Sequence, residues 1–297
     1  MKQKKKVIIS FSFIAAVLFF LPIFAFCETK ESNDAPEWMK RINFGAELGT
    51  DQKPYFYFET VQPLYQDIDK LSTVFIQPRI SMHEERPAYN LGIGYRKLLS
   101  ENTIMLGTNM FFDYEADHDH YRTGLGLEAF VNLIECRVNS YIGLSPRRLV
   151  HEVGIMREYE KAVDGFDWEF GLPIPFMNWI KLFGGGYWYN YEKFKNKEGW
   201  QVRTEIKPFK FTTLNFITFD DNKGDMEYRV DARVNLPFGT GGKNEEKICN
   251  IGLSKTAYSE KVDHSNRVLD RVERQYKIEV ERWTENAGAV VEIKRGN

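Results

Sequence analysis

The feature that most constrains the fold is a strict two-residue alternation of side-chain character, which is clearest in residues 103–144. One set of alternate positions is mostly apolar and contains Ile104, Leu106, Met110, Phe112, Tyr114, Tyr121, Leu125, Leu127, Ala129 and Val131. The other set contains polar residues and glycines, namely Gly107, Asn109, Asp113, Arg122, Gly124, Gly126 and Glu128. Successive side chains of a β-strand point to opposite faces, so a period of two predicts strands with one apolar face.

The alternation recurs in twelve strand-like runs, over residues 41–50, 55–65, 71–81, 88–97, 103–114, 120–131, 135–144, 164–173, 179–191, 199–208, 211–219 and 226–237. A strand of about ten residues, tilted by about 40°, spans roughly the 25 Å apolar band of an outer membrane. An even count returns the chain to its starting side, as bacterial barrels require. The sequence therefore predicts an all-β fold, a transmembrane antiparallel up-and-down β-barrel over residues 41–238. A soluble β-sandwich with its charges on the outer face is the alternative.

The composition is compatible with such a barrel. Hydrophobic residues make up 43% of the chain and the mean hydropathy is −0.44, which is too polar for a helical membrane protein. A barrel tolerates this polarity because only alternate strand residues face lipid. The net charge of −2 gives no indication of a nucleic-acid partner.

The two faces of the predicted strands define candidate site residues. A polar ladder is expected to face the lumen, formed by Arg122, Glu128, Arg137, Asp167, Glu169, Arg203, Glu205, Arg229, Asp231 and Arg233. The residues expected to face lipid include Leu125, Leu127, Phe166, Trp168, Phe170, Trp200, Val230 and Val234. Charges in a dry core cost several kcal/mol each unless they are paired, whereas charges facing a wet lumen cost little.

The amino terminus predicts export. Four lysines precede an apolar stretch from Val7 to Ala25, a pattern typical of a secretory signal peptide over residues 1–27 and of the Sec pathway. The alternatives are an uncleaved anchor helix and a lipidated Cys27. Residues 28–40 are polar and are expected to form a short periplasmic lead.

Three motifs resemble a known family. They are the run FFDYEADHDHYRTGLGLEAF at 111–130, the run DGFDW at 164–168 and the turn LPIP at 172–175. Together they resemble the β-domain of inverse autotransporters, the intimin and invasin family, over roughly residues 41–238. The resemblance implies a twelve-stranded outer-membrane barrel that anchors and exports an adhesin in type V secretion, without enzymatic activity. The implied partners are outer-membrane lipid, the outer-membrane insertion machinery and periplasmic chaperones.

The carboxyl-terminal tail, residues 239–297, begins with the flexible joint Gly239-Thr240-Gly241-Gly242. Residues 272–278 and 290–294 resemble the family's linker, which passes through the pore, so we expect the tail to enter the lumen as a linker or a plug. Residues 267–278 could form a short amphipathic helix, or residues 278–280 and 290–293 could form strands. The sequence contains no passenger domain after this linker, which leaves a passive or plugged structural pore as the alternative function.

Candidate chemistry is sparse. The run Asp117-His118-Asp119-His120 holds metal-ligand residue types, but adjacent strand residues point apart, so we predict no metal site and no cofactor. The acid pairs Asp167 with Glu169 and Glu205 with Asp231 are interpreted as lumen charges neutralised by Arg203, Arg229 and Arg233. The chain contains no nucleophile elbow, P-loop or zinc-ligand spacing, so we predict no catalytic residue. An outer-membrane barrel hydrolase is the least favoured alternative.

Overall fold

The computed structural model describes residues 36–50, 52–83, 86–236, 250–286 and 289–292. The predicted signal peptide, most of the periplasmic lead and the glycine joint lie outside these residues. Residues 36–40 contribute the start of a single 3-10 turn, η2 (Met39–Arg41). In the described part of the chain, no helix is long and apolar enough to cross a membrane.

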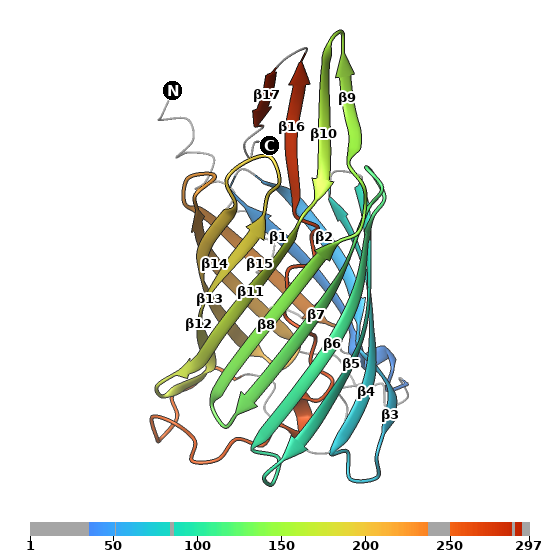
Figure 1. The fold of residues 1–297 in the computed structure, drawn as a ribbon. Coiled ribbons are helices and arrows are strands. Elements are labelled where there is room, and N and C mark those ends of the chain that lie inside the picture. The colour runs from blue at the N-terminus through green and yellow to red at the C-terminus, as the bar shows by residue number, and fades with distance from the viewer. Residues whose placement is uncertain (1–35, 51, 84–85, 237–249, 287–288, 293–297) are drawn as a thin grey trace. The chain divides into compact units, whose positions relative to one another are not determined.

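Antiparallel strands close into a barrel, as the sequence predicts (Figure 1). The wall strands are β1 (Ile42–Gly49), β2 (Gln52–Thr60) with β3 (Gln62–Gln66), β4 (Ser72–His83), β5 (Arg86–Leu99), β6 (Ile104–Glu115), β7 (His120–Val131), β8 (Ile134–Gly143), β11 (Asp164–Ile174), β12 (Met177–Asn190), β13 (Lys197–Phe209), β14 (Thr212–Asp221) and β15 (Glu227–Asn235). Strands β2 and β3 both pair with β4 and are separated only by Val61, so they form one wall strand and the ring holds twelve. The ring closes because β1 pairs with β15 on one side and with β2 on the other.

The two ends of the barrel differ. At one end, called the turn end here, tight connections join β7 to β8, β11 to β12 and β13 to β14. Asn132 and Phe176 take positive φ values of 53° and 66° in these turns, as close reversals require. At the opposite end, called the loop end, residues 144–163 form the longest connection between wall strands.

A second, four-stranded sheet lies at the loop end and has the order β17-β16-β10-β9 (Figure 1). Strands β9 (Arg148–Val153) and β10 (Met156–Ala162) form a hairpin within the long connection. Strands β16 (Val280–Asn286) and β17 (Ala289–Glu292) belong to the tail. The predicted helix over residues 267–278 is wrong, because the only helical turn of that region is η3 (Ser265–Arg267), whereas strands form close to the positions of the alternative prediction.

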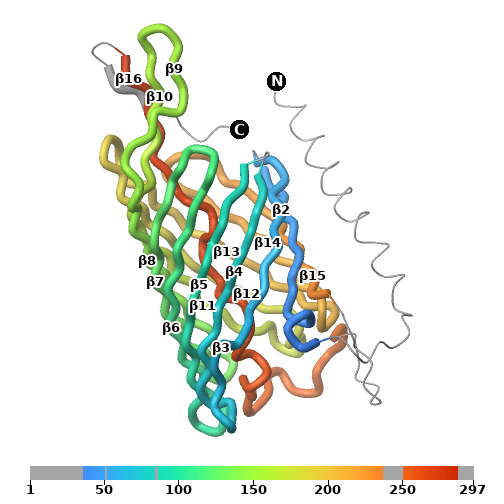
Figure 2. Tube along the Cα trace, turned by 90° about the vertical axis from the view of Figure 1, so that its right-hand side faces the viewer, coloured from blue at the N-terminus to red at the C-terminus, as the bar shows by residue number. Residues whose placement is uncertain are grey.

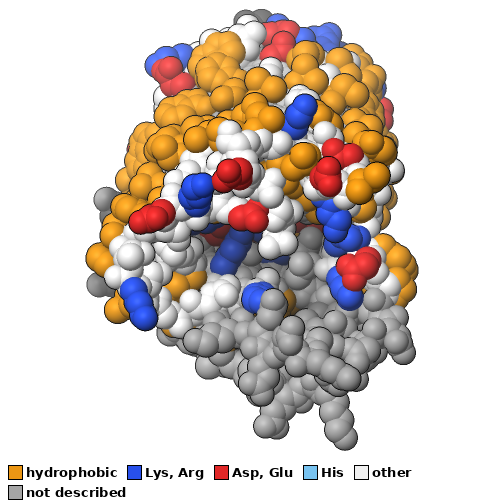
Figure 3. Space-filling view, turned by 90° about the horizontal axis from the view of Figure 1, so that it is seen from below, with side chains coloured by type: hydrophobic (Ala, Val, Ile, Leu, Met, Phe, Trp, Pro, Cys, Tyr) orange, Lys and Arg blue, Asp and Glu red, His pale blue; other side chains and the backbone are white. Residues whose placement is uncertain are grey.

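The barrel wall separates two side-chain environments. Outward apolar side chains such as Leu127 and Phe112 are exposed, while inward neighbours such as Phe111 and Glu128 are buried. Seen from the turn end, apolar side chains cover the outer wall and charged side chains gather around the rim (Figure 3). The buried side chains therefore lie inside the barrel, which makes the lumen the place to look for a functional site.

Candidate functional site: a lumen occupied by the carboxyl-terminal segment

Residues 250–263 cross the turn end of the barrel. The Asn250 amide donates to the Pro208 carbonyl at 2.9 Å, beside the β13–β14 turn. The Phe176 amide of the β11–β12 turn donates to the Ala257 carbonyl at 2.9 Å. The Val262 amide donates to Asn132 Oδ1 at 2.9 Å, in the β7–β8 turn. This part of the tail is thus held by successive turns before it reaches the lumen.

Residues 264–279, which we call the lumen segment, then run through the barrel from the turn end to the loop end (Figure 2). Its entry is marked by the His264 amide, which donates to the Asn102 carbonyl at 2.9 Å in the β5–β6 turn. Its exit is marked by the Glu279 carbonyl, which accepts from the Val163 amide at 3.1 Å. Val163 lies at the base of the β9–β10 hairpin, which we call the outer hairpin. Beyond that point, β16 pairs antiparallel with β10 in the outer sheet. The tail therefore traverses the whole length of the wall.

The wall binds the backbone of the lumen segment through side chains. Arg96 donates to the carbonyls of Val268 and Asp270 at 3.1 and 2.5 Å. Gln77 Oε1 accepts from the Val272 amide at 3.0 Å, and Asn90 Nδ2 donates to the Tyr276 carbonyl at 3.1 Å. These contacts supply partners for backbone groups that form no β-ladder and would otherwise be left unpaired in a buried place.

Charges on the lumen segment pair with charges on the wall. The pairs are Arg267 with Glu135 at 2.7 Å, Arg271 with Glu59 at 3.0 Å, Glu273 with Arg233 at 3.5 Å, Arg274 with Asp113 at 2.8 Å, and Glu279 with Lys197 at 2.6 Å. Both partners of the Arg274–Asp113 pair are almost fully buried. The signs on the segment and on the wall are thus matched along the full course of the lumen.

Apolar side chains of the lumen segment also pack on the inner wall. Val272 and Tyr276 join a buried cluster with Val61, Phe75 and Phe111. Nearer the turn end, Val268 packs in a second cluster with Leu98, Met105 and Phe130, and Leu269 contacts both clusters. The segment is therefore held by burial of apolar area as well as by charge.

The structure places the predicted polar ladder on the inner face of the wall. Eight of its residues are buried and two, Asp167 and Arg229, are half-buried. Six of the ladder residues line a cavity that remains beside the lumen segment, namely Arg137, Asp167, Glu169, Arg203, Arg229 and Asp231. The other four lie against neighbouring side chains. Glu128, for example, is bound by Arg96 at 2.9 Å.

The predicted pairing of the ladder holds in part. Arg203 binds Glu169 at 2.6 Å, as the sequence predicts. Arg229 instead lies 3.6 Å from Glu47 on β1, and Arg233 binds Glu273 of the lumen segment. Asp231 accepts hydrogen bonds from Tyr57 Oη and from Asn215 rather than from an arginine.

The residues expected to face lipid lie on the outer face. Leu125, Leu127, Phe166, Trp168, Phe170 and Trp200 are exposed, and Leu127 is the most exposed of them at 64%. Val230 and Val234 on β15 are half-buried.

Sequence reasoning missed the apolar part of the inner wall. The signal that could have found it is the placement of aromatic residues opposite glycines on adjacent strands. A Cβ added to Gly94 would lie 2.3 Å from Phe75 Cζ, and one added to Gly92 would lie 2.3 Å from the Phe111 ring. These glycines make room for inward phenylalanine rings, on which Val272 and Tyr276 then pack.

Beside the lumen segment the barrel retains a cavity of about 500 Å³. Its lining includes Glu47, Arg79, Asn215 and Arg229 from the wall, and Arg271 and Glu273 from the segment. The segment therefore fills only part of the lumen.

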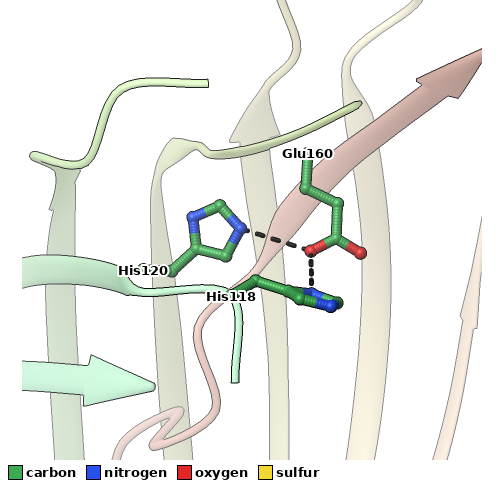
Figure 4. Close-up of side chains that lie close together, drawn as sticks. All are labelled: His118, His120 and Glu160. Carbon is green, nitrogen blue, oxygen red and sulfur yellow. Dashed lines mark hydrogen bonds and ion pairs between the residues drawn. The ribbon is translucent and has the colours of Figure 1, made fainter. Parts of the chain in front are cut away.

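A separate cluster lies at the loop end of the barrel, where the structure brings His118 and His120 together with Glu160 of β10 (Figure 4). Glu160 Oε2 lies 2.8 Å from His118 Nδ1 and 3.2 Å from His120 Nε2. Arg282 of β16 contacts the other carboxylate oxygen. Burial alone would raise the pKa of Glu160, but the hydrogen bond from His120 and the nearby charges of Arg282 and His118 lower it to about 2.

Comparison with known sequences and structures gives consistent matches. Residues 27–276 match the sequence profile of the family described as inverse autotransporter, beta-domain. The inverse autotransporter adhesin YeeJ of Escherichia coli K12 is 28% identical over 144 residues, which is 47% of this chain and 6% of that protein. Intimin of Escherichia coli O127:H6 is 36% identical over 93 residues, which is 31% of this chain and 9% of that protein.

The matches to these relatives therefore cover only a small part of their length. Among solved structures, one described as "Unveiling the Mechanism Behind the in-meso Crystallization of Membrane Proteins" superposes with a TM-score of 0.62 at 19% identity. The superposition covers 82% of this chain and 99% of that chain, which establishes a shared barrel fold.

Proposed function

The chain belongs to the inverse autotransporter β-domain family, and from that membership we propose that it anchors and exports a polypeptide carried beyond its lumen segment. The protein lies in the outer membrane, where its wall meets lipid. The observation that carries the proposal is the course of residues 264–286, which enter at the turn end, cross the lumen and pair with the outer hairpin. An exported chain must follow this route.

The wall performs the anchoring. Exposed apolar side chains such as Leu125, Leu127 and Phe170 face the hydrocarbon, where each backbone group of the closed barrel is already paired. The short connections of the turn end face the periplasm, since outer-membrane barrels keep short periplasmic turns and longer outer loops. We propose further that the chain is exported by the Sec pathway, delivered by periplasmic chaperones and assembled by the outer-membrane insertion machinery.

The lumen provides the path. Side chains of Arg96, Gln77 and Asn90 bind backbone atoms of the lumen segment. This part of the binding therefore does not depend on the side chains of the polypeptide that crosses the lumen. An extended chain can then cross at membrane depth without unpaired backbone groups. No step of this process breaks a covalent bond, so the function requires no catalytic residue.

The outer hairpin receives the emerging chain. Strand β16 adds to the edge of β10, with Trp283 opposite Tyr159 and their rings stacked at 5.8 Å. Adding a strand to an exposed edge recruits main-chain hydrogen bonds, which favours the outer position over return into the lumen. The hairpin therefore acts as a docking edge for the exported polypeptide.

The test is a display experiment in cells. A small folded domain with an epitope is fused after Asn297, and antibody binding to intact cells is measured. The matched control carries the same fusion on a chain that lacks residues 264–286 but keeps the wall strands. We expect display from the complete chain and none from the control. Retention of the epitope in the periplasm by a complete, heat-modifiable barrel would contradict the proposal.

A plugged pore is the second candidate, and the buried ion pair and apolar cluster that hold the lumen segment to the wall favour it. In that function the segment closes the lumen and carries nothing. Conductance across planar bilayers separates the two, when the full chain is compared with a chain ending at residue 236. A plug predicts low conductance for the full chain together with no display of the fused domain.

A further inference from the structure

Three metal-ligating side chains converge at the loop end from two separate parts of the chain. His118 lies in the β6–β7 connection, His120 is the first residue of β7, and Glu160 lies on β10. One donor atom from each lies within 4.8 Å of the other two. The turn before β7, in which Asp119 takes a positive φ of 56°, brings the two imidazoles toward the same carboxylate (Figure 4).

The other ring nitrogens are held by orienting groups. His118 Nε2 lies 3.1 Å from Asp117 Oδ2, and His120 Nδ1 lies 3.1 Å from Ser145 Oγ. Asp117 is itself bound by Arg86 at 2.9 Å. A carboxylate or hydroxyl on the outer nitrogen of an imidazole is the arrangement by which proteins orient histidine ligands of a metal.

His118 carries a hydrogen-bonding conflict that a metal ion would remove. In the neutral form of His118 one ring nitrogen is an acceptor, yet both nitrogens face carboxylate oxygens, which only accept; either a second proton or a metal ion on the ring resolves this conflict. With a metal ion at Nδ1, Nε2–H donates to Asp117 and both contacts become favourable. Glu160 Oε1 keeps its contact with Arg282, so Glu160 Oε2, which faces the histidines, remains available to bind the ion.

We propose that His118 Nδ1, His120 Nε2 and Glu160 Oε2 bind a divalent transition-metal ion, with zinc as the best fit to two imidazoles and one carboxylate. Zinc bonds of about 2.0–2.1 Å place tetrahedral ligand atoms about 3.3 Å apart. The contacts of 2.8 and 3.2 Å are therefore close to the edges of such a tetrahedron. Three protein ligands leave the fourth position to water.

The ion would fasten the outer sheet to the barrel. It joins the β6–β7 connection and β7 to β10, whose two edges pair with β9 and β16. The inference is independent of the proposed export function, because it concerns only how the hairpin is held. Its consequence is a hairpin that is fixed in position when zinc is present.

The test is zinc titration of the full chain, purified in detergent without a histidine tag and stripped with a chelator, followed by calorimetry. We expect one ion per chain. His120→Ala and Glu160→Gln should each lose at least about tenfold in affinity, and Asp117→Asn about 10- to 100-fold as an orienting carboxylate. His151→Ala is the matched control, because His151 is exposed on the same hairpin and away from the cluster.

Heat-modifiable mobility establishes that each variant is folded, and X-ray absorption at the zinc edge counts the imidazoles on the ion. Two imidazoles and the predicted losses support the site. Absence of saturable binding by the folded chain, or an unchanged affinity in a folded variant carrying both His120→Ala and Glu160→Gln, would overturn it.

Discussion

Two nitrogens of Arg274 donate to the two oxygens of Asp113 at 2.9 and 2.8 Å, and this pair joins the lumen segment to strand β6 in the interior of the barrel. Arg122 binds the same carboxylate at 2.8 Å from strand β7. Parallel two-point pairing of this kind fixes geometry as well as charge, so it locates the segment along the wall.

Replacing Arg274 with alanine should loosen the lumen segment without unfolding the barrel. Asp113 keeps Arg122, so the cost should be less than the roughly 3–5 kcal/mol of a fully uncompensated buried partner. We expect protease cleavage within residues 264–279 to accelerate about tenfold, which corresponds to about 1.4 kcal/mol. The control is Lys261→Ala, whose pair with Glu101 is exposed and should contribute little. Equal cleavage of both variants would show that the buried pair does not hold the segment.

Truncating Val272 tests the apolar contacts between the lumen segment and the wall. Val272 is completely buried against Phe75 and Phe111, so Val272→Ala should weaken binding of the segment by about 1.5 kcal/mol or more. Leu253→Ala is the control, since Leu253 belongs to the same tail and is 78% exposed. Hydrogen exchange of the segment's amides measures both changes. Similar exchange in the two variants would mean that burial at Val272 is not what holds the chain.

Arginine on the outer wall tests the lipid-facing surface. Leu127 is 64% exposed at mid-strand, where arginine costs about 2–4 kcal/mol in a bilayer. Leu149→Arg is the matched control on β9, outside the barrel wall, where the change should stay within about 0.5 kcal/mol. Urea titration of folding into lipid vesicles gives both free energies. A comparable loss for the two variants would place Leu127 away from lipid.

The wall of the barrel could be predicted from the sequence because alternation is a local signal. Leu127 and Glu128 are adjacent, and their burial differs as the period of two requires. The apolar inner patch could not be predicted in the same way. Phe75 and Phe111 would be poor choices for an empty polar lumen, and only the lumen segment, some 160–200 residues later in the sequence, explains why they are buried.

The outer cluster and the β9–β10 hairpin escaped prediction for a related reason. Strands β9 and β10 carry no strong alternation, and β10 gains its second partner from β16, which is more than 100 residues away in sequence. Unless this hairpin is predicted, nothing in the sequence indicates that Glu160 lies beside His118 and His120. Long-range pairing decided both features, and a local pattern contains no information about it.

The central claim is that the tail passes through the barrel from one side of the membrane to the other. The most direct measurement is labelling of single cysteines on intact cells with a membrane-impermeant maleimide, in a chain whose native Cys27, Cys136 and Cys249 are replaced. Asn286→Cys lies at the end of β16 beyond the loop end, and Lys255→Cys lies at the turn end. We predict that Asn286→Cys is labelled on intact cells, whereas Lys255→Cys is labelled only after the outer membrane is permeabilised. Protection of Asn286→Cys on intact cells, or equal labelling of the two positions, would contradict the account.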